Sequence, residues 1–271
     1  MTGRFAWALC ALSAISVCGP FMAQAQVETG DEMSAQEVAE MMSDPAAELT
    51  FFNASYRVYL DIGPFEDTIH EVRLQGAGFL TLPSKSLIAY RAYVPLYSMD
   101  WPVDDDGVGD ALFSAYWASR HGNLVMGYGG ALIAPTASED YFGLDKWCAG
   151  PTLIIAQKVP GICTLGGLLT HIWSFAGNDE REDVSLTTIQ PACIFFLNEL
   201  GTSLTLTSET TYDWQVDDDA WRVPATLVLE QVLPPVGSVY FSVAAGGTYY
   251  IEKPEYEGDW DARATLSLII P

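Results

Sequence analysis

The chain has 271 residues and 35 acidic against 12 basic ones, a net charge of −23 that excludes nucleic acid as a partner because phosphates would be repelled. Hydrophobic residues make up 49% and aromatic residues 12% of the chain, which excludes extended disorder. After residue 30 no run of about 18 apolar residues occurs, which argues against a transmembrane helix there.

The first 25 residues read as a signal peptide. Arg4 gives a basic start, residues 5–17 form an apolar core, and the small residues Ala23 and Ala25 flank a cleavage motif that predicts a cut before Gln26. The chain is therefore expected to be exported. Removing the peptide leaves three cysteines, which fit small apolar side chains inside strands better than a metal site: Cys148, Cys163 and Cys193.

A short helix is expected after a polar leader, within a leader-and-helix segment over residues 26–49. Ser34 and Glu37 fit a capping box, in which the glutamate reaches back to the serine amide. Roughly ten helical residues should follow, with Val38 and Met41 on one face, and should end near Asp44 because a proline comes next. Two placements stay open: the helix plugs a barrel, or it lies at the periplasmic rim.

From residue 50 to residue 271 the pattern is extended. Hydrophobic and polar residues alternate, and most stretches are longer than soluble strands and suit a tilted membrane span. An even number of such strands is typical of bacterial outer-membrane barrels. The faces of the seventh and eighth strands are ambiguous by period. We predict strands at 50–60, 68–82, 86–97, 109–118, 123–135, 146–157, 161–174, 184–197, 202–213, 221–232, 238–251 and 260–270.

The first strand shows the alternation clearly. Phe52 and Tyr56 share one face, whereas Asn53, Ser55 and Arg57 share the other. A soluble sandwich would show the same period, but in a barrel the apolar face meets lipid and the polar face meets the lumen. Five prolines fall within the predicted strands and predict bulges or ladder ends: Pro95, Pro135, Pro151, Pro191 and Pro224.

Acidic residues concentrate in every second connection. An up-and-down sheet places alternate connections on the same side, so the barrel should have one acidic, external end and one periplasmic end with short turns. Aromatic residues near strand ends suit an interfacial girdle. The acidic connections are centred on residues 61–67, 104–107, 138–140, 179–183, 217–219 and 252–261.

Several segments together resemble one known family. They are 150–152, 170–177, 208–214 and 221–224, and the opening helix and the closing strand also fit. They are similar to the outer-membrane family named for the MetA pathway of phenol degradation, whose members are often called simply transporters. The resemblance covers nearly all of the mature chain. It implies a bacterial outer-membrane barrel for the uptake of small compounds, with aromatic ones among the candidates.

The candidate selectivity residues lie on the polar face of the strands. The arginines among them either form a basic wall that favours anionic solutes in a water-filled constriction, or take part in a salt-bridge network that fills a narrow lumen. The candidates are Arg57, Arg73, Arg91, Arg222, Arg263, Glu71, Asp110 and Glu209.

Other chemistry has weaker support. An acyl hydrolase needs a serine and a histidine on the same face. His171 and Ser174 lie close together in the sequence, but a spacing of three in a strand puts them on opposite faces, which argues against this activity. Two aspartate runs are weak candidates for divalent ions, without the ligand spacing of a dedicated calcium loop, and solvated loops explain them as well. They are Asp104, Asp105, Asp106, Asp217, Asp218 and Asp219.

The sequence thus predicts an all-β, up-and-down antiparallel transmembrane barrel of about twelve strands with a short N-terminal helix, located in the bacterial outer membrane. The expected function is passive passage of small solutes, with aromatic or anionic ones as candidates. The alternative is a structural or adhesive barrel with a blocked lumen. No enzymatic activity, catalytic residue or cofactor is expected. The expected partners are outer-membrane lipid and an unidentified small solute, and the sequence does not set the oligomeric state.

Overall fold

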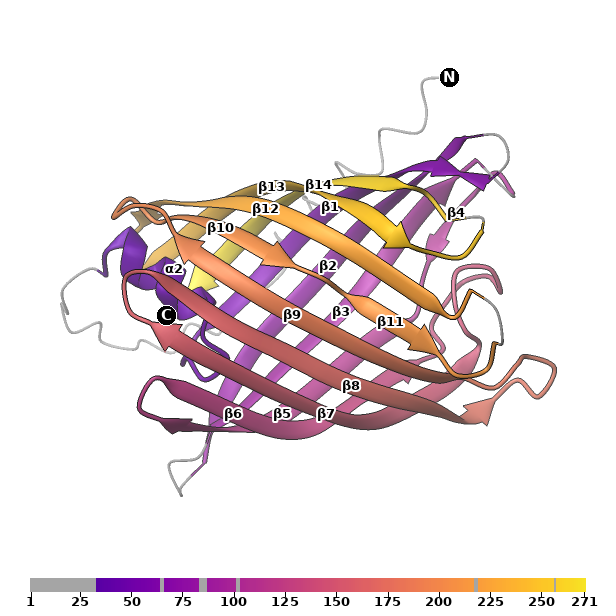
Figure 1. Cartoon of the computed structure of the whole chain (residues 1–271), viewed down its shortest axis with the longest axis horizontal. Helices are drawn as coiled ribbons and strands as arrows, with labels where there is room; N and C mark the ends of the chain where they lie inside the picture. The colour runs from indigo at the N-terminus through magenta and orange to yellow at the C-terminus, as the bar shows by residue number, and fades with distance from the viewer. Residues whose placement is uncertain (1–32, 64–65, 83–86, 101–102, 217–218, 256) are drawn as a thin grey trace, which may run out of the picture. The chain divides into compact units, whose positions relative to one another are not determined.

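The computed structural model describes residues 33–63, 66–82, 87–100, 103–216, 219–255 and 257–271. The predicted signal peptide and the first part of the leader lie outside these residues. Within them the chain forms one short helix and a series of long strands, as the alternation predicts (Figure 1). The elements are α2 (Ala35–Met42), β1 (Thr50–Ile62), β2 (Asp67–Thr81), β3 (Leu87–Met99), β4 (Asp105–Val108), β5 (Ala111–His121), β6 (Leu124–Ala134), β7 (Lys146–Val159), β8 (Cys163–Gly177), β9 (Ser185–Phe196), β10 (Thr202–Thr207), β11 (Thr210–Asp213), β12 (Trp221–Val236), β13 (Val239–Glu252) and β14 (Trp260–Ile270).

The strands close into a barrel. Each pairs antiparallel with its neighbours along the chain, and β1 pairs with β14 from Thr50↔Ile270 to Leu60↔Trp260, which joins the two ends of the sheet. Strands β10 and β11 share one position between β9 and β12, and β4 pairs only with β3. The wall therefore has twelve strand positions, which confirms the predicted fold.

Apolar side chains point out of the barrel and polar ones point in. On β1, Phe52 is 55% and Tyr56 is 46% exposed, and Leu266 of the paired β14 is 48% exposed. The residues of the inward face carry hydroxyl groups that form hydrogen bonds between neighbouring strands. Thr265, for example, donates to Ser55 at 3.0 Å. The structure also assigns the two faces of β8, which were ambiguous from the sequence: Leu169 and Trp173 are exposed on the outside, and Ile172 is buried on the inside.

The prolines interrupt the ladder, as predicted. At Pro95 the partner of β3 changes from β5 to β4, and the β12–β13 register shifts at Pro224. Pro191 stands opposite the gap between β10 and β11, so the strand predicted over 202–213 is broken at Ser208 and Glu209. A proline supplies no amide donor, so the neighbouring strand loses its ladder bond at that point.

The helix α2 lies inside one end of the barrel. Its capping box is present: the Glu37 amide donates to Ser34 Oγ and the Ser34 amide donates to the Glu37 carboxylate. Val38 has no exposed surface, and it packs with Ala39 among inward-facing residues of four strands. Full burial of a valine side chain contributes roughly 1.5–3 kcal/mol. The strand residues around the helix are Phe196, Val232, Tyr240 and Ile269.

Residues 33–49, here called the plug, are also held by charged contacts. Lys158 pairs with Glu40 at 3.1 Å, and Arg120 pairs with Asp44 at 2.7 Å. The plug lies at the end formed by the short turns, away from the acidic connections (Figure 1, left). Of the two placements left open by the sequence, the structure therefore has the helix in the lumen. Among the described residues no helix is long and apolar enough to cross a membrane.

The three cysteines lie within strands β7, β8 and β9. None forms a disulfide, and Cys148 and Cys163 are buried. Their positions agree with the predicted role as small apolar side chains.

Candidate functional site: the lumen and its arginine network

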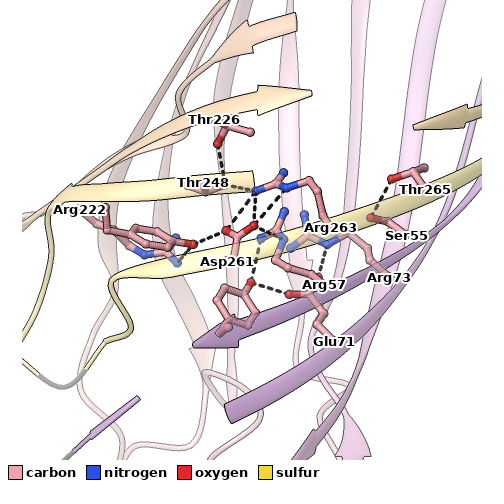
Figure 2. Close-up of polar contacts among 12 residues, drawn as sticks. Ser55, Arg57, Glu71, Arg73, Arg222, Thr226, Thr248, Asp261, Arg263 and Thr265 are labelled. Carbon is pink, nitrogen blue, oxygen red and sulfur yellow. Dashed lines mark hydrogen bonds and ion pairs between the residues drawn. The ribbon is translucent and has the colours of Figure 1, made fainter. Parts of the chain in front are cut away.

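Four of the predicted arginines gather on one side of the lumen. The closure of the barrel brings them together, because the first and last strands become neighbours. Arg57 of β1 stands directly opposite Arg263 of β14 and, on its other side, opposite Glu71 of β2. Figure 2 shows these side chains together with Arg73 and Arg222.

Asp261 is the carboxylate at the centre of this group. Its side chain has no exposed surface, and it accepts hydrogen bonds from Arg263 at 3.1 Å and from the Tyr250 hydroxyl at 2.8 Å. Arg57 lies 3.9 Å away across the ladder. The sequence analysis missed Asp261 because it counted this residue with the acidic connection. Its parity, the same as that of Arg263, was the signal that could have placed it inside.

Glu71 links the next two arginines. Its side chain is 2% exposed and accepts hydrogen bonds from Arg73 Nε and from the Tyr59 hydroxyl, both at 2.7 Å. Tyr59 in turn accepts a hydrogen bond from Arg57 Nη1 at 2.8 Å. The tyrosine thus connects the two halves of the group, and it was also missed although it shares the parity of Arg57.

Arg222 completes the group from β12. It pairs with Glu257, and its guanidinium lies 4.7 Å from the centre of the Tyr250 ring and donates to the hydroxyl of that tyrosine at 3.1 Å. The set Arg57, Arg73, Arg222, Arg263, Glu71, Asp261 and Glu257 is here called the arginine network. Four guanidinium groups against three carboxylates leave one net positive charge.

The other predicted lumen residues lie apart from this network. Arg91 of β3 faces inward and donates to Ser114 Oγ at 3.2 Å. Glu209 lies at the break between β10 and β11 and lines the same cavity as Arg73 and Arg91. Asp110 does not join the arginines, because its carboxylate accepts the backbone amides of Thr136, Ala137 and Leu144 and so shapes the connection between β6 and β7.

Three cavities follow one another along the lumen. The outer cavity, about 220 Å³, is bounded by residues such as Tyr59, Tyr97 and Arg222. The middle cavity, about 180 Å³, is bounded by Arg73 and Arg91 among others, and the inner cavity, about 230 Å³, lies over the plug. Since Arg57 and Glu71 lie between the levels of Tyr59 and Arg73 along their strands, the arginine network separates the outer cavity from the middle one.

The connections at the acidic end fold toward the mouth. Phe142 is buried and stacks on the inward-facing Tyr97, with ring centres 5.7 Å apart. Lys146 binds Asp183 at 3.2 Å, and this hydrogen bond holds the pKa of the Asp183 carboxyl below its usual value. The connections from β6 to β7 and from β8 to β9 are thereby tied to the barrel rim.

The aspartate runs do not form a metal site in the part of the chain that the structure describes. There, no three His, Cys, Asp or Glu side chains come close enough to hold an ion, and Asp217 and Asp218 lie outside the described ranges. Asp105 instead accepts the hydroxyl of Tyr141, which raises the pKa of that tyrosine to about 12.

His171 and Ser174 lie on opposite faces of β8, as their spacing predicts. The His171 ring shares a hydrogen bond with the Thr187 hydroxyl at 2.7 Å on the outer surface. Ser174 points to the other side and donates to Asp183. The two side chains therefore cannot act together as a nucleophile and its base.

No protein-family model and no curated protein matches this sequence. Solved structures do resemble it. The COG4313 outer membrane channel from Pseudomonas putida F1 has 14% identity and a TM-score of 0.63 over 84% of this chain and 98% of that chain. The NanC porin has 8% identity and a TM-score of 0.54 over 82% of this chain and 99% of that chain. The resemblance to the MetA-pathway family stays a prediction, and the fold of the chain is that of outer-membrane channel barrels.

Proposed function

We propose that the chain is an outer-membrane channel through which small solutes diffuse passively. The observation that carries the proposal is the row of cavities inside a closed barrel with an apolar exterior. Large apolar side chains such as Leu153, Ile155 and Leu227 are about half exposed on the outer surface. A closed barrel satisfies all backbone groups internally, which is the condition for strands to cross lipid.

The direction of the barrel follows from its two ends. Tryptophans near the acidic end, such as Trp147, Trp173 and Trp260, are exposed on the outer surface, where an interfacial girdle is expected. In outer-membrane barrels the short turns face the periplasm and the longer connections face outside. The plug is therefore proposed to lie at the periplasmic end and the acidic connections outside the cell.

The arginine network is proposed to set selectivity. It lies at the level between the outer and middle cavities, and its single net positive charge acts in a narrow space of low dielectric. Small anions would thus be favoured over cations of the same size at this point, even though the outer connections are acidic.

Planar bilayer recording of the mature protein under a potassium chloride gradient tests both parts of the proposal. The double variant Arg57→Ala, Arg263→Ala changes the network from one net positive to one net negative charge. We expect its reversal potential to shift toward cation preference. Arg222→Gln, at the partly exposed edge of the network, removes one charge with less risk to folding and should shift the potential in the same direction.

Arg181→Gln is the matched control, since this arginine bonds to backbone carbonyls in the outer connections. It should leave the reversal potential unchanged. A wild-type protein without any conductance would instead support the blocked, structural barrel. Conductance with equal reversal potentials in wild type and in the network variants would show that the network does not select.

A further inference from the structure

Arg91 differs from the other inward-facing arginines in its partners. Arg57, Arg73, Arg222 and Arg263 each lie beside a carboxylate, whereas Arg91 has no ion pair among the described residues and bonds only to the Ser114 hydroxyl. A guanidinium without a counter-ion inside a barrel is costly unless a ligand completes its hydrogen bonds. This arginine is therefore available to an anion that enters the lumen.

The position of Arg91 makes it reachable from two cavities. It lines both the middle and the inner cavity, a property that among the described residues only Gln75 shares. Two carboxylates also line these spaces. Asp44 of the plug is already paired with Arg120 at 2.7 Å, and Glu209 stands in the middle cavity with Arg73 as well as Arg91. Since Arg73 is already paired with Glu71 at 2.7 Å, Arg91 is the guanidinium of the middle cavity that stands outside any ion pair among the described residues.

The surroundings of Arg91 have a polar and an apolar side. The wall of the middle cavity carries hydroxyl and amide groups, including Thr170, Thr188 and Gln190. The inner cavity has an apolar floor made jointly by the plug and the barrel wall. That floor consists of Met41, Met42, Leu49, Phe51, Ile154 and Ile194.

We propose that Arg91 binds the carboxylate of a small amphipathic acid whose apolar body occupies the inner cavity over the plug. Arginine recognises a carboxylate with two parallel hydrogen bonds, and the apolar floor would shield the rest of the molecule from water. A dry apolar cavity of about 150 Å³ is large enough for benzene. The inner cavity, about 230 Å³, thus suits a compound of the size of benzoate. The inference rests on the proposed function, because the solute must enter through the lumen.

Calorimetry on the mature wild-type protein in detergent tests the site without relying on conductance. Benzoate is the probe, benzyl alcohol is its uncharged counterpart, and acetate keeps the carboxylate but lacks the ring. We expect benzoate to bind about tenfold or more tightly than either, because benzyl alcohol loses the charged contact and acetate loses the apolar one. Equal affinity for benzoate and benzyl alcohol, or for benzoate and acetate, would overturn the proposal.

Variants then assign the contact to one residue. Arg91→Gln should weaken benzoate binding about tenfold or more, and Arg91→Lys should restore part of it, because a lysine keeps the charge but not the paired donors. Arg181→Gln, with the same charge change in the outer connections, should bind benzoate as the wild type does. Unchanged affinity in a folded Arg91→Gln barrel would refute the assignment.

Binding and conductance separate the two proposals. A barrel that binds benzoate through Arg91 but conducts no ions would retain the site and overturn the channel. A barrel that conducts ions but shows no heat of benzoate binding would retain the channel and overturn the site.

Discussion

Asp261 is the residue on which the arginine network is centred, and its environment makes its removal costly. The carboxylate is enclosed by two arginines and a tyrosine with no exposed surface. Burial of charges is tolerated when partners complete the hydrogen bonds, and removing one partner leaves the others uncompensated. The three groups around Asp261 would then repel one another or lose their acceptor.

Asp261→Asn should therefore lower the free energy of unfolding by about 3–5 kcal/mol. Urea unfolding of the barrel in detergent, followed by tryptophan fluorescence, measures the change. Asp259→Asn is a close control, because Asp259 pairs with Lys253 at the surface, where its side chain is 55% exposed. An exposed pair contributes about 0–1 kcal/mol, so equal losses in the two variants would contradict the central role of Asp261.

Glu37 carries a second prediction at the residue scale, this time in the plug. The backbone amide of Ser34, and then its hydroxyl, bond to this carboxylate and lower the pKa of Glu37. Because the pKa of Glu37 is lower in the folded state, this carboxylate stabilises the helix at pH values above its usual pKa of 4.5. The stabilisation is lost as the pH falls through the folded-state pKa.

The carbon-13 shift of the Glu37 carboxyl should thus titrate with a midpoint below 4.5. Ser34→Ala should move the midpoint upward, since it removes the hydroxyl but keeps the amide donor. A wild-type midpoint at or above 4.5 would show that the capping box is not formed in solution.

At the scale of elements, the plug and the barrel are joined by ion pairs near the ends of strands β5 and β7. Lys158 and Arg120 lie at the end of the barrel that holds the plug, and each pairs with a carboxylate of the plug. Glu40 also accepts the Gly161 amide at 3.2 Å, so the helix end is held near the turn between β7 and β8. These contacts fix the plug on the side of the lumen opposite the buried face of α2.

Removing these ion pairs should open the end of the barrel that holds the plug. The double variant Arg120→Ala, Lys158→Ala removes both ion pairs, and we expect its single-channel conductance to rise above that of the wild type. Lys253→Ala, which breaks a pair at the other end of the barrel, should leave the conductance unchanged. If the double variant conducts as the wild type does, the plug is held by its apolar face alone.

The sequence predicts these elements to different degrees. A period of two is a local property, so the strands and the inward arginines could be predicted residue by residue. The break at Ser208 and Glu209 could not, because it arises where Pro191 of β9 and Pro224 of β12 flank the same strand position from its two sides. The place of α2 also depends on distant partners, since Val232 and Ile269 bury a helix some 200 residues earlier in the chain.

The whole molecule offers a test of its surroundings. Its outer surface carries exposed apolar side chains such as Leu165, Leu206 and Val243. Its backbone hydrogen bonds run from strand to strand around the closed barrel. Such a surface favours lipid over water. We expect the mature protein to stay in the membrane pellet after an alkaline wash of cells. Recovery in the soluble fraction would contradict the membrane placement and, with it, the channel.

The thiols within the wall have a consequence for maturation. The predicted export would take the chain through an oxidising compartment, in which unpaired cysteines are prone to wrong disulfides. Thiol exchange requires access to the sulfur. Once the barrel is closed, Cys148 and Cys163 are buried and therefore shielded from oxidoreductases. Closure of the barrel thus protects these two thiols from disulfide exchange, whereas Cys193 of β9 stays partly exposed.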